Sequence, residues 1–308
     1  MPSPSLTTTY RGRFAPTPSG PLHLGSLLTA LASWLDARAA HGRWLLRIDD
    51  LDQARCPPGA ENQILRQLEA HGLTWDEAPR RQSQHRAEYQ AALKTLTERG
   101  LVYECSCTRA QLARAGHDGI DGPVYPGTCR QGPRGSGKRS MRFRVAPGPI
   151  LLEDGIQGVT ARDGESDIGD FIVQRSDGIF GYHLACVVDE HAQRITDVVR
   201  GADLLGSSLC QKLLQQAFAY TPPSYAHLAV LVDESGRKLS KQNHAIPIDA
   251  RMAGSNLFTS LNVLGQQPPA ALERAGVREI LDWARPHWRR DQLARHHSLA
   301  LATQMSYT

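Results

Sequence analysis

The sequence predicts an α/β fold with a parallel sheet, an irregular insertion and a short helical C-terminal region. Strand, loop, helix and strand patterns follow one another over residues 10–48, which is the start expected of a parallel sheet. Hydrophobic periodicity disappears over residues 104–140, where glycine, proline and charged residues dominate. Beyond Ala250 the apolar pattern is mainly helical.

The first half of the sheet is expected over residues 1–103. Its elements in order are a strand at 10–15, a helix from 23 to a stop at Gly42, a buried strand at 44–48, and helices around 59–72 and 84–99. The loop between the first strand and helix is rich in proline and glycine and cannot be regular structure. This strand–loop–helix–strand order indicates a Rossmann-like sheet.

The rest of the chain divides into a second half of the same sheet, at residues 141–250, and a helical region at 251–308. Strands are expected at 141–145, 171–175, 185–189, 195–199 and 228–231, with a helix at 207–220. Short helical pieces are expected at 270–275, 278–284 and 291–301.

Composition indicates a globular protein of ordinary polarity. Of the 308 residues, 41% are hydrophobic and 21% are charged, and the formal net charge of +4 is compatible with an RNA partner. No apolar run approaches the roughly 20 residues that span a bilayer, and the N-terminus lacks a signal-peptide pattern. We therefore expect a cytoplasmic protein with no membrane association and reduced thiols, in which Cys186 and Cys210 are core residues.

The loop and helix start at residues 13–26 form the first candidate nucleotide site. A strand hands over to a helix here, and in an open parallel sheet this is the edge where ligands bind. The helix start offers unpaired N–H groups to phosphates, and Gly25 lets a flat ligand approach the backbone. His23 can donate to a phosphate oxygen as charge builds on it, although a helix-capping or core role for this histidine remains open.

A second candidate nucleotide segment follows the apolar strand at 228–231. It carries Lys238, Ser240 and Lys241 on a loop that contains Gly236. Lysine is a compact charge that can follow phosphates as they move, so the loop suits a triphosphate; a solvated basic loop is the alternative.

Together the two segments resemble the HIGH and KMSKS signatures of class I aminoacyl-tRNA synthetases. Residues 13–20 resemble the RFAPSPTG opening of glutamyl-tRNA synthetases, residues 47–55 their RIEDTDxxR, and residues 182–190 with 199–204 their YxLAxVVDD…VRGxD. The matching motifs are spread over residues 10–245. This resemblance implies the class I catalytic fold, with ATP as a substrate, Mg²⁺ on its triphosphate, His23 and Lys241 as catalytic residues, and His23, Gly25, Lys238, Ser240 and Lys241 as the ATP contacts.

The same resemblance implies a pocket for L-glutamate. Its residues are Arg13, Ala15, Thr17, Asp49, Tyr182 and Arg200. Arginine suits such a substrate because its planar fork pairs with a carboxylate through two hydrogen bonds. Asp49 would bind the ammonium group, but the family usually has glutamate at this position, and the shorter side chain loses reach. For Asp50 and Asp52, capping and salt bridges at the strand end are as good an interpretation as substrate contact.

The insertion at 104–140 contains a candidate metal site. Cys105, Cys107 and Cys129 lie close together in a segment with few apolar residues, so a structural Zn²⁺ would supply the missing stability. The spacing resembles the zinc site of glutamyl-type synthetases, which implies Tyr125 as the fourth ligand. His117 is the alternative on chemical grounds, and three free surface cysteines are the alternative without metal.

Fewer than seventy residues follow the lysine loop, so we expect no anticodon-binding domain. The resemblance is therefore to a short, stand-alone branch of the family that activates glutamate without tRNA and transfers it to queuosine at the wobble position of tRNA(Asp). Two alternatives remain open: a shortened glutamyl-tRNA synthetase that charges tRNA(Glu), and a non-catalytic tRNA-binding regulatory protein. Candidate RNA contacts are Arg134, Lys138, Arg139, Arg285, Arg289 and Arg290. Nothing in the sequence demands a partner subunit, so a monomer is expected.

Overall fold

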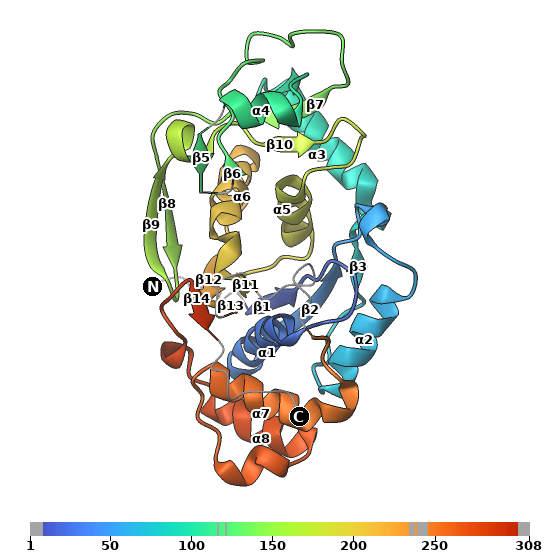
Figure 1. The fold of residues 1–308 in the computed structure, drawn as a ribbon, viewed down its shortest axis with the longest axis vertical. Coiled ribbons are helices and arrows are strands. Elements are labelled where there is room, and N and C mark those ends of the chain that lie inside the picture. Colours follow the sequence, from blue (N-terminus) through green and yellow to red (C-terminus); the bar gives the residue numbers. More distant parts are fainter. Residues whose placement is uncertain (1–8, 116, 121, 234–237, 239–245, 301–308) are drawn as a thin grey trace, which may run out of the picture.

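The computed structural model of the chain describes residues 9–115, 117–120, 122–233, 238 and 246–300. At its centre is a seven-stranded sheet (Figure 1). The strand order is β3 (Arg80–Arg81), β2 (Arg43–Ile48), β1 (Arg11–Phe14), β11 (Asp197–Gly201), β12 (Ser224–Leu228), β8 (Pro149–Asp154) and β9 (Gly158–Asp163). All neighbouring pairs are parallel except β8 and β9. The predicted α/β fold with a mostly parallel sheet is confirmed.

Helices cover both faces of this sheet. The helices are α1 (Leu24–Ala39), α2 (Ala60–Ala70), α3 (Arg86–Glu98), α4 (Arg109–Ala115), α5 (Tyr182–Ala192), α6 (Leu205–Phe218), α7 (Ala253–Val263) and α8 (Val277–His287). Figure 1 shows α1, α7 and α8 on one side of the sheet and α5 and α6 on the other. Two hydrophobic clusters fill the spaces between these layers. None of the described helices is long and apolar enough to cross a membrane.

Strand residues alternate between the two clusters, as the pleat of a strand requires. Leu46 and Val199 pack on the α1 side, whereas Leu45 and Val198 pack on the α5 side. This alternation fixes which face each polar residue of these strands meets.

A second, antiparallel sheet stands apart from the first. It joins β4 (Val102–Cys105), β7 (Ser140–Phe143) and β10 (Ile172–Gln174) in the order β10-β7-β4. Two short pairs complete the strands: β5 (Asp118–Gly119) with β6 (Gly122–Pro123), and β13 (Val230–Val232) with β14 (Ser298–Ala300). The strands predicted near 141 and 171 therefore exist as β7 and β10, but they pair with each other, and β7 also pairs with β4, outside the central sheet. The division of the chain into four segments remains a prediction.

The strand predicted at 185–189 is wrong, because these residues lie in the middle of α5. Leu184 to Val188 are all buried, and Val187 and Val188 are β-branched. A short apolar run of this kind looks the same whether a strand or an all-round buried helix contains it. In the structure this run packs against α3 and α6 as part of helix α5, so tertiary contacts select the helical conformation.

The helical piece predicted at 291–301 is also wrong in its described part. A single 3₁₀ turn occupies Arg290–Gln292, and the chain then forms β14 beside β13. The partner strand is almost seventy residues away in sequence, so no local pattern could show the pairing.

The buried stripe of α1 generates a stability prediction. Leu31 has no exposed surface and belongs to the cluster between α1 and α7. We expect Leu31→Ala to lower the free energy of unfolding by about 2–5 kcal/mol, because it removes buried methyl groups and leaves a cavity. Leu151→Ala, at a site that is 52% exposed, is the control, with an expected loss below about 1 kcal/mol. Urea denaturation measures both, and equal losses would contradict the assignment of the core.

Candidate active site

A cleft of about 770 Å³ opens where β1 and β11 end. These strands are adjacent, and their carboxyl ends face the start of α1. The predicted substrate residues that line the cleft are Arg13, Ala15, Thr17, His23, Gly25, Tyr182, Arg200 and Lys238. Ser240 and Lys241 lie outside the described residues, so their roles remain predictions.

His23 both caps α1 and lines the cleft. Its Nδ1 accepts a hydrogen bond from the Ser26 amide at 3.3 Å, which satisfies one of the unpaired N–H groups of the helix start. The capping interpretation is therefore observed, and it does not exclude a nucleotide contact, because the residue also belongs to the cleft wall. Gly25, two residues further along, lines the same wall.

Arg200 comes from β11 and is 3% exposed. Its Nη2 donates to Ser208 Oγ at 2.6 Å and to Gln211 Oε1 at 2.7 Å, both on α6. Its Nη1 is buried and has no hydrogen-bond partner in the described part of the chain. A buried guanidinium N–H without a partner is costly, so this side of Arg200 is a good position for a ligand acceptor such as a carboxylate.

Arg13, on β1, is held by a carboxylate. Its Nε lies 3.1 Å from Glu190 Oε1, and its Nη1 donates to the Val199 carbonyl at 3.2 Å. Both partners of the ion pair are buried. Arg13 therefore reaches the cleft with its orientation fixed and much of its charge balanced by Glu190.

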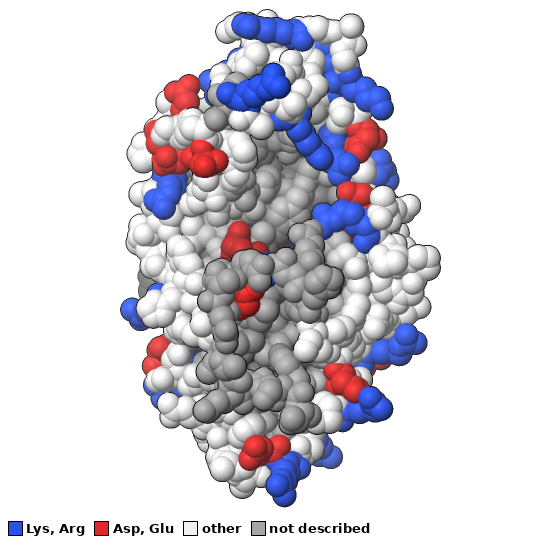
Figure 2. Space-filling model, in the orientation of Figure 1, with Lys and Arg blue, Asp and Glu red and all other residues white. Residues whose placement is uncertain are grey.

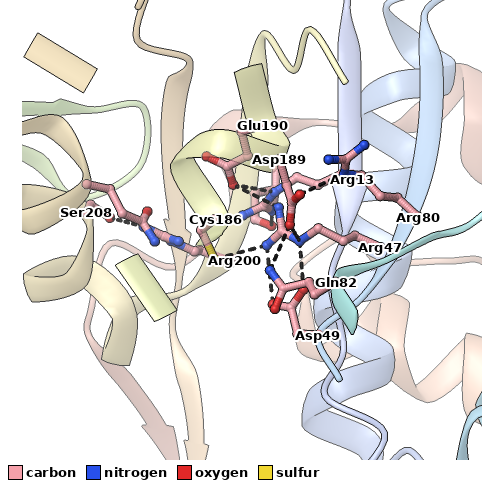
Figure 3. A network of polar contacts seen from close by, with 12 residues as sticks. Arg13, Arg47, Asp49, Arg80, Gln82, Cys186, Asp189, Glu190, Arg200 and Ser208 are labelled. Carbon is pink, nitrogen blue, oxygen red and sulfur yellow. Dashed lines mark hydrogen bonds and ion pairs between the residues drawn. The ribbon is translucent and has the colours of Figure 1, made fainter. Parts of the chain in front are cut away.

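Behind Arg13, a fully buried Arg47 joins three carboxylates. Its Nε lies 2.7 Å from Asp49 Oδ1, while Asp189 and Glu190 lie at 3.8 and 3.7 Å. Figure 3 shows Arg13 and Arg47 beside Asp189 and Glu190 of α5, while Arg200 extends toward Ser208. Strand alternation places all three arginines on this face, opposite Phe14, Leu46 and Val199 in the α1 cluster.

Asp49 is the predicted substrate residue that the structure does not bring to the cleft wall. Its carboxylate is 8% exposed and is held by Nε and Nη2 of Arg47. Burial raises the pKa of Asp49 above its ordinary value, and the Arg47 guanidinium opposes this shift. An ammonium group would have to compete with Arg47, so the contact of Asp49 with substrate remains a prediction.

Lys238 reaches the rim of the cleft as an ion pair. Its Nζ lies 2.5 Å from Asp203 Oδ2, just beyond the end of β11. Sequence analysis did not single out Asp203, although it stands three residues after Arg200. Arg55 also lines the cleft and was not predicted. It lies at the end of a 3₁₀ turn, Gln53–Arg55, that follows β2, and no sequence signal separates it from other surface arginines.

Asp50 and Asp52 form contacts within the protein, as the interpretation by capping and salt bridges expects. Asp50 accepts hydrogen bonds from the Ser83 amide and hydroxyl at 2.8 and 2.6 Å. Asp52 forms an ion pair with Arg175 at 2.8 Å. The prediction that Cys186 and Cys210 are buried is confirmed.

The cysteine cluster of the insertion forms in space. The sulfur atoms of Cys105, Cys107 and Cys129 all lie within 4.8 Å of one another, and Tyr125 Oη lies 3.4 and 3.5 Å from the first two. A tetrahedral site with ~2.3 Å metal–sulfur bonds has sulfur–sulfur edges of about 3.8 Å, so the donor set fits zinc. His117 instead contacts the Ser166 carbonyl at 2.6 Å.

Comparison with known proteins agrees with this fold. The family model described as "tRNA synthetases class I (E and Q), catalytic domain" matches residues 9–264. The chain belongs to this family of class I tRNA synthetases. Two crystal structures of glutamate-specific enzymes superpose on 96% of the chain with a TM-score of 0.77: a glutamate-tRNA synthetase from Elizabethkingia anophelis, 25% identical, and a glutamate tRNA ligase from Elizabethkingia meningosepticum, 26% identical. The superposition covers 69% and 68% of those chains.

More similar relatives carry a narrower name. A protein of Thiobacillus denitrificans named glutamyl-Q tRNA(Asp) synthetase is 48% identical over 94% of this chain and 96% of its own length. A protein of the same name from Aromatoleum aromaticum is 49% identical over 91% of this chain and 89% of its own length. The resemblance to the short branch of the family is confirmed.

The buried ion network generates a second stability prediction. We expect Arg47→Met to lower the free energy of unfolding by about 3–5 kcal/mol, because the carboxylates around it are left buried without their shared cation. Arg43→Met is the matched control: Arg43 lies on the same strand, its side chain is 58% exposed in an ion pair with Glu77, and the expected change is below about 1 kcal/mol. Urea denaturation measures both. A change at Arg47 no larger than at Arg43 would show that the network does not stabilise the fold.

Proposed function

We propose that the protein activates L-glutamate with ATP to form glutamyl-adenylate, without tRNA, and then transfers the glutamyl group to queuosine at the wobble position of tRNA(Asp). The observation that carries the first step is the pair of buried arginines, Arg13 and Arg200, at the carboxyl ends of adjacent strands in one cleft. Two fixed cations match a substrate with two carboxylates. Tyr182, which is 38% exposed, completes this wall.

The chemistry of activation needs positioning and charge stabilisation. An α-carboxylate oxygen of glutamate attacks the α-phosphorus of ATP, the bond to the β-phosphate oxygen breaks, and pyrophosphate leaves. The start of α1 at His23 and Gly25 faces the cleft and suits the phosphates. Lys238, which also lines the cleft, is proposed to bind the triphosphate together with Ser240 and Lys241. Mg²⁺ bound to the triphosphate would neutralise its charge. No covalent enzyme intermediate is required.

The acceptor is proposed from the relatives and from the chemistry of the adenylate. A hydroxyl of the queuosine cyclopentenediol attacks the carbonyl carbon of the mixed anhydride, and AMP leaves. The proteins similar to this chain over nearly their whole length are named for glutamyl transfer to this nucleoside of tRNA(Asp). The charging of tRNA(Glu) and a non-catalytic regulatory role are the alternatives that this name disfavours. Both tRNA and ATP indicate a cytoplasmic reaction.

We propose Cys105, Cys107, Cys129 and Tyr125 as the ligands of one structural zinc ion. The Cys129 amide donates to Tyr125 Oη at 2.9 Å, and the Arg142 guanidinium lies 3.9 Å from the centre of the Tyr125 ring. Both contacts favour a phenolate, although burial and the neighbouring thiols raise the pKa of Tyr125. The ion would fix the irregular segment around β4, and no step of the reaction passes through it.

The tRNA surface is proposed near the same insertion. Lys and Arg side chains gather at the end of the molecule that carries α4 and β7 (Figure 2). Of the candidate contacts, Arg285, Arg289 and Arg290 each lie within 4 Å of an aspartate, whereas Arg134 and Lys138 form no ion pair within the described residues. Cations without a carboxylate partner are better placed to contact phosphates. A monomeric protein is part of this proposal.

The first test is glutamate-dependent exchange of pyrophosphate into ATP without tRNA. We expect exchange with glutamate and at least about tenfold less with glutamine, because glutamine lacks the second carboxylate for the arginines. Complete absence of exchange would sink the enzymatic proposal. The acceptor is then tested with radiolabelled glutamate and tRNA(Asp) with or without queuosine, and label on tRNA(Glu) alone would overturn the queuosine assignment.

The zinc proposal predicts one zinc ion per purified chain by elemental analysis. Cys107→Ser should lose the metal and lower the melting temperature, because a structural site contributes folding energy. Cys56→Ser is the matched control, since Cys56 is far in sequence from the cluster and takes no part in it. Equal zinc contents in the two variants would contradict this ligand set.

A further inference from the structure

Behind Arg200, a line of buried polar groups runs across three neighbouring strands. Arg200 Nε donates to His227 Nε2 at 3.3 Å, and His227 Nδ1 lies 2.5 Å from Asp154 Oδ2. These residues come from β11, β12 and β8, which are adjacent in the sheet. His227 has no exposed surface, and Asp154 is 8% exposed. The sequence predicted no contact among Arg200, His227 and Asp154.

The partners of His227 define its protonation. A carboxylate at 2.5 Å requires a proton on Nδ1, whereas the N–H of Arg200 requires a lone pair on Nε2. Ser208 Oγ, at 2.8 Å from Nε2, can donate to the same lone pair. The imidazole is therefore neutral with its proton on Nδ1. Consistently, burial lowers the pKa of His227 and outweighs the opposing effect of Asp154.

Asp154 is itself held in place. Its Oδ1 accepts the backbone N–H groups of Ile156, Gln157 and His227 at 2.9, 2.8 and 3.1 Å, which leaves Oδ2 for the imidazole. Burial raises the pKa of Asp154, but these hydrogen bonds and that of His227 lower it further, so the group is a carboxylate. A fixed acceptor on one side of a histidine determines which nitrogen carries the proton.

The arrangement distinguishes Arg200 from Arg13. The Nε of Arg13 is paired with a carboxylate, whereas that of Arg200 meets a neutral nitrogen, and Arg200 forms no ion pair within the described residues. A neutral acceptor orients a guanidinium without compensating its charge. The full charge of Arg200 is then available at Nη1, the buried atom that lacks a partner.

We propose that His227, with its proton fixed on Nδ1 by Asp154, is a positioning residue that holds Arg200 for an anionic substrate and keeps its charge uncompensated. This inference rests on the proposed binding of glutamate in the cleft. His227 and Asp154 do not line the cleft and do not touch the substrate. Their contribution is selectivity for a carboxylate over an amide.

The substitution Asp154→Asn tests the proton assignment with little change of shape. The side-chain oxygen can still accept the three backbone N–H groups, while an NH₂ group replaces the oxygen that faces His227. That group donates to Nδ1, so the imidazole proton of His227 moves to Nε2. Nε2 can then no longer accept a hydrogen bond from the N–H of Arg200. We expect the KM for glutamate to rise about tenfold or more, with kcat and the KM for ATP within about threefold of the parent, because a ground-state contact is lost. The preference for glutamate over glutamine should fall by a similar factor.

Asp36→Asn is the matched control. Asp36 is also 8% exposed and also accepts several hydrogen bonds, from Tyr10 and Trp288, but it lies on α1 away from the cleft. It should lose stability without a change in the KM for glutamate. A rise in that KM as large as for Asp154→Asn would show a general effect of destabilisation and overturn the proposal.

A second pair of variants covers the case in which Asp154→Asn does not fold. His227→Gln retains an acceptor for Arg200 and should keep the KM for glutamate within about threefold of the parent, whereas His227→Leu removes the acceptor and should raise it. Equal KM values in the two variants would contradict the positioning role.

Nuclear magnetic resonance of ¹⁵N-labelled histidine reads the proton directly. The parent protein should show His227 protonated on Nδ1, and Asp154→Asn should show it on Nε2. A parent protein protonated on Nε2 overturns the inference while leaving the proposed function intact. Conversely, the expected proton position without glutamate-dependent exchange would overturn the proposed function.

Discussion

The rest of the structure depends on the burial of three arginines at one edge of the sheet. Arg13, Arg47 and Arg200 are each no more than 3% exposed, and guanidinium groups in such surroundings need acceptors on every side. Asp189 and Glu190 on α5, with Ser208 and Gln211 on α6, supply several of those acceptors, while Nη1 of Arg200 is left without one in the described chain. The position of these two helices over the sheet is therefore tied to the charge on the strands beneath them, and the cleft follows from both.

Within that arrangement the cations are not equivalent. Arg47 lies among three carboxylates, Arg13 pairs with one, and Arg200 with none in the described chain. The number of carboxylates that balance the arginine charge therefore decreases from Arg47 on β2 to Arg13 on β1 and Arg200 on β11. The guanidinium with the least compensation has a buried N–H without a partner and lines the cleft. A gradient of this kind stabilises the interior with one arginine while it leaves another able to attract an anion.

Membership of the class I tRNA synthetases explains why these features lie where β1 meets α1 and where β11 ends. Parallel strands present their carboxyl ends at a common edge, so residues from distant parts of the chain can meet one ligand there. The same edge receives Lys238 through its ion pair with Asp203. The cysteine cluster lies apart, in the antiparallel sheet of β4, β7 and β10, which suits a structural role.

By itself, the sequence determined the α/β fold, the helix start at His23, the two arginines of the cleft and the clustered cysteines. The fold, the helix start and the cysteines rest on local patterns of residue types, which persist in any fold that keeps the local structure, whereas the two arginines follow from the resemblance to glutamyl-tRNA synthetases. Tertiary structure decided that residues 185–189 are helical, that β14 pairs with β13, and that Asp49 turns to Arg47. It also decided that His227 stands between Arg200 and Asp154. These outcomes depend on contacts between segments far apart in the chain. A local sequence pattern cannot predict the energies of such contacts.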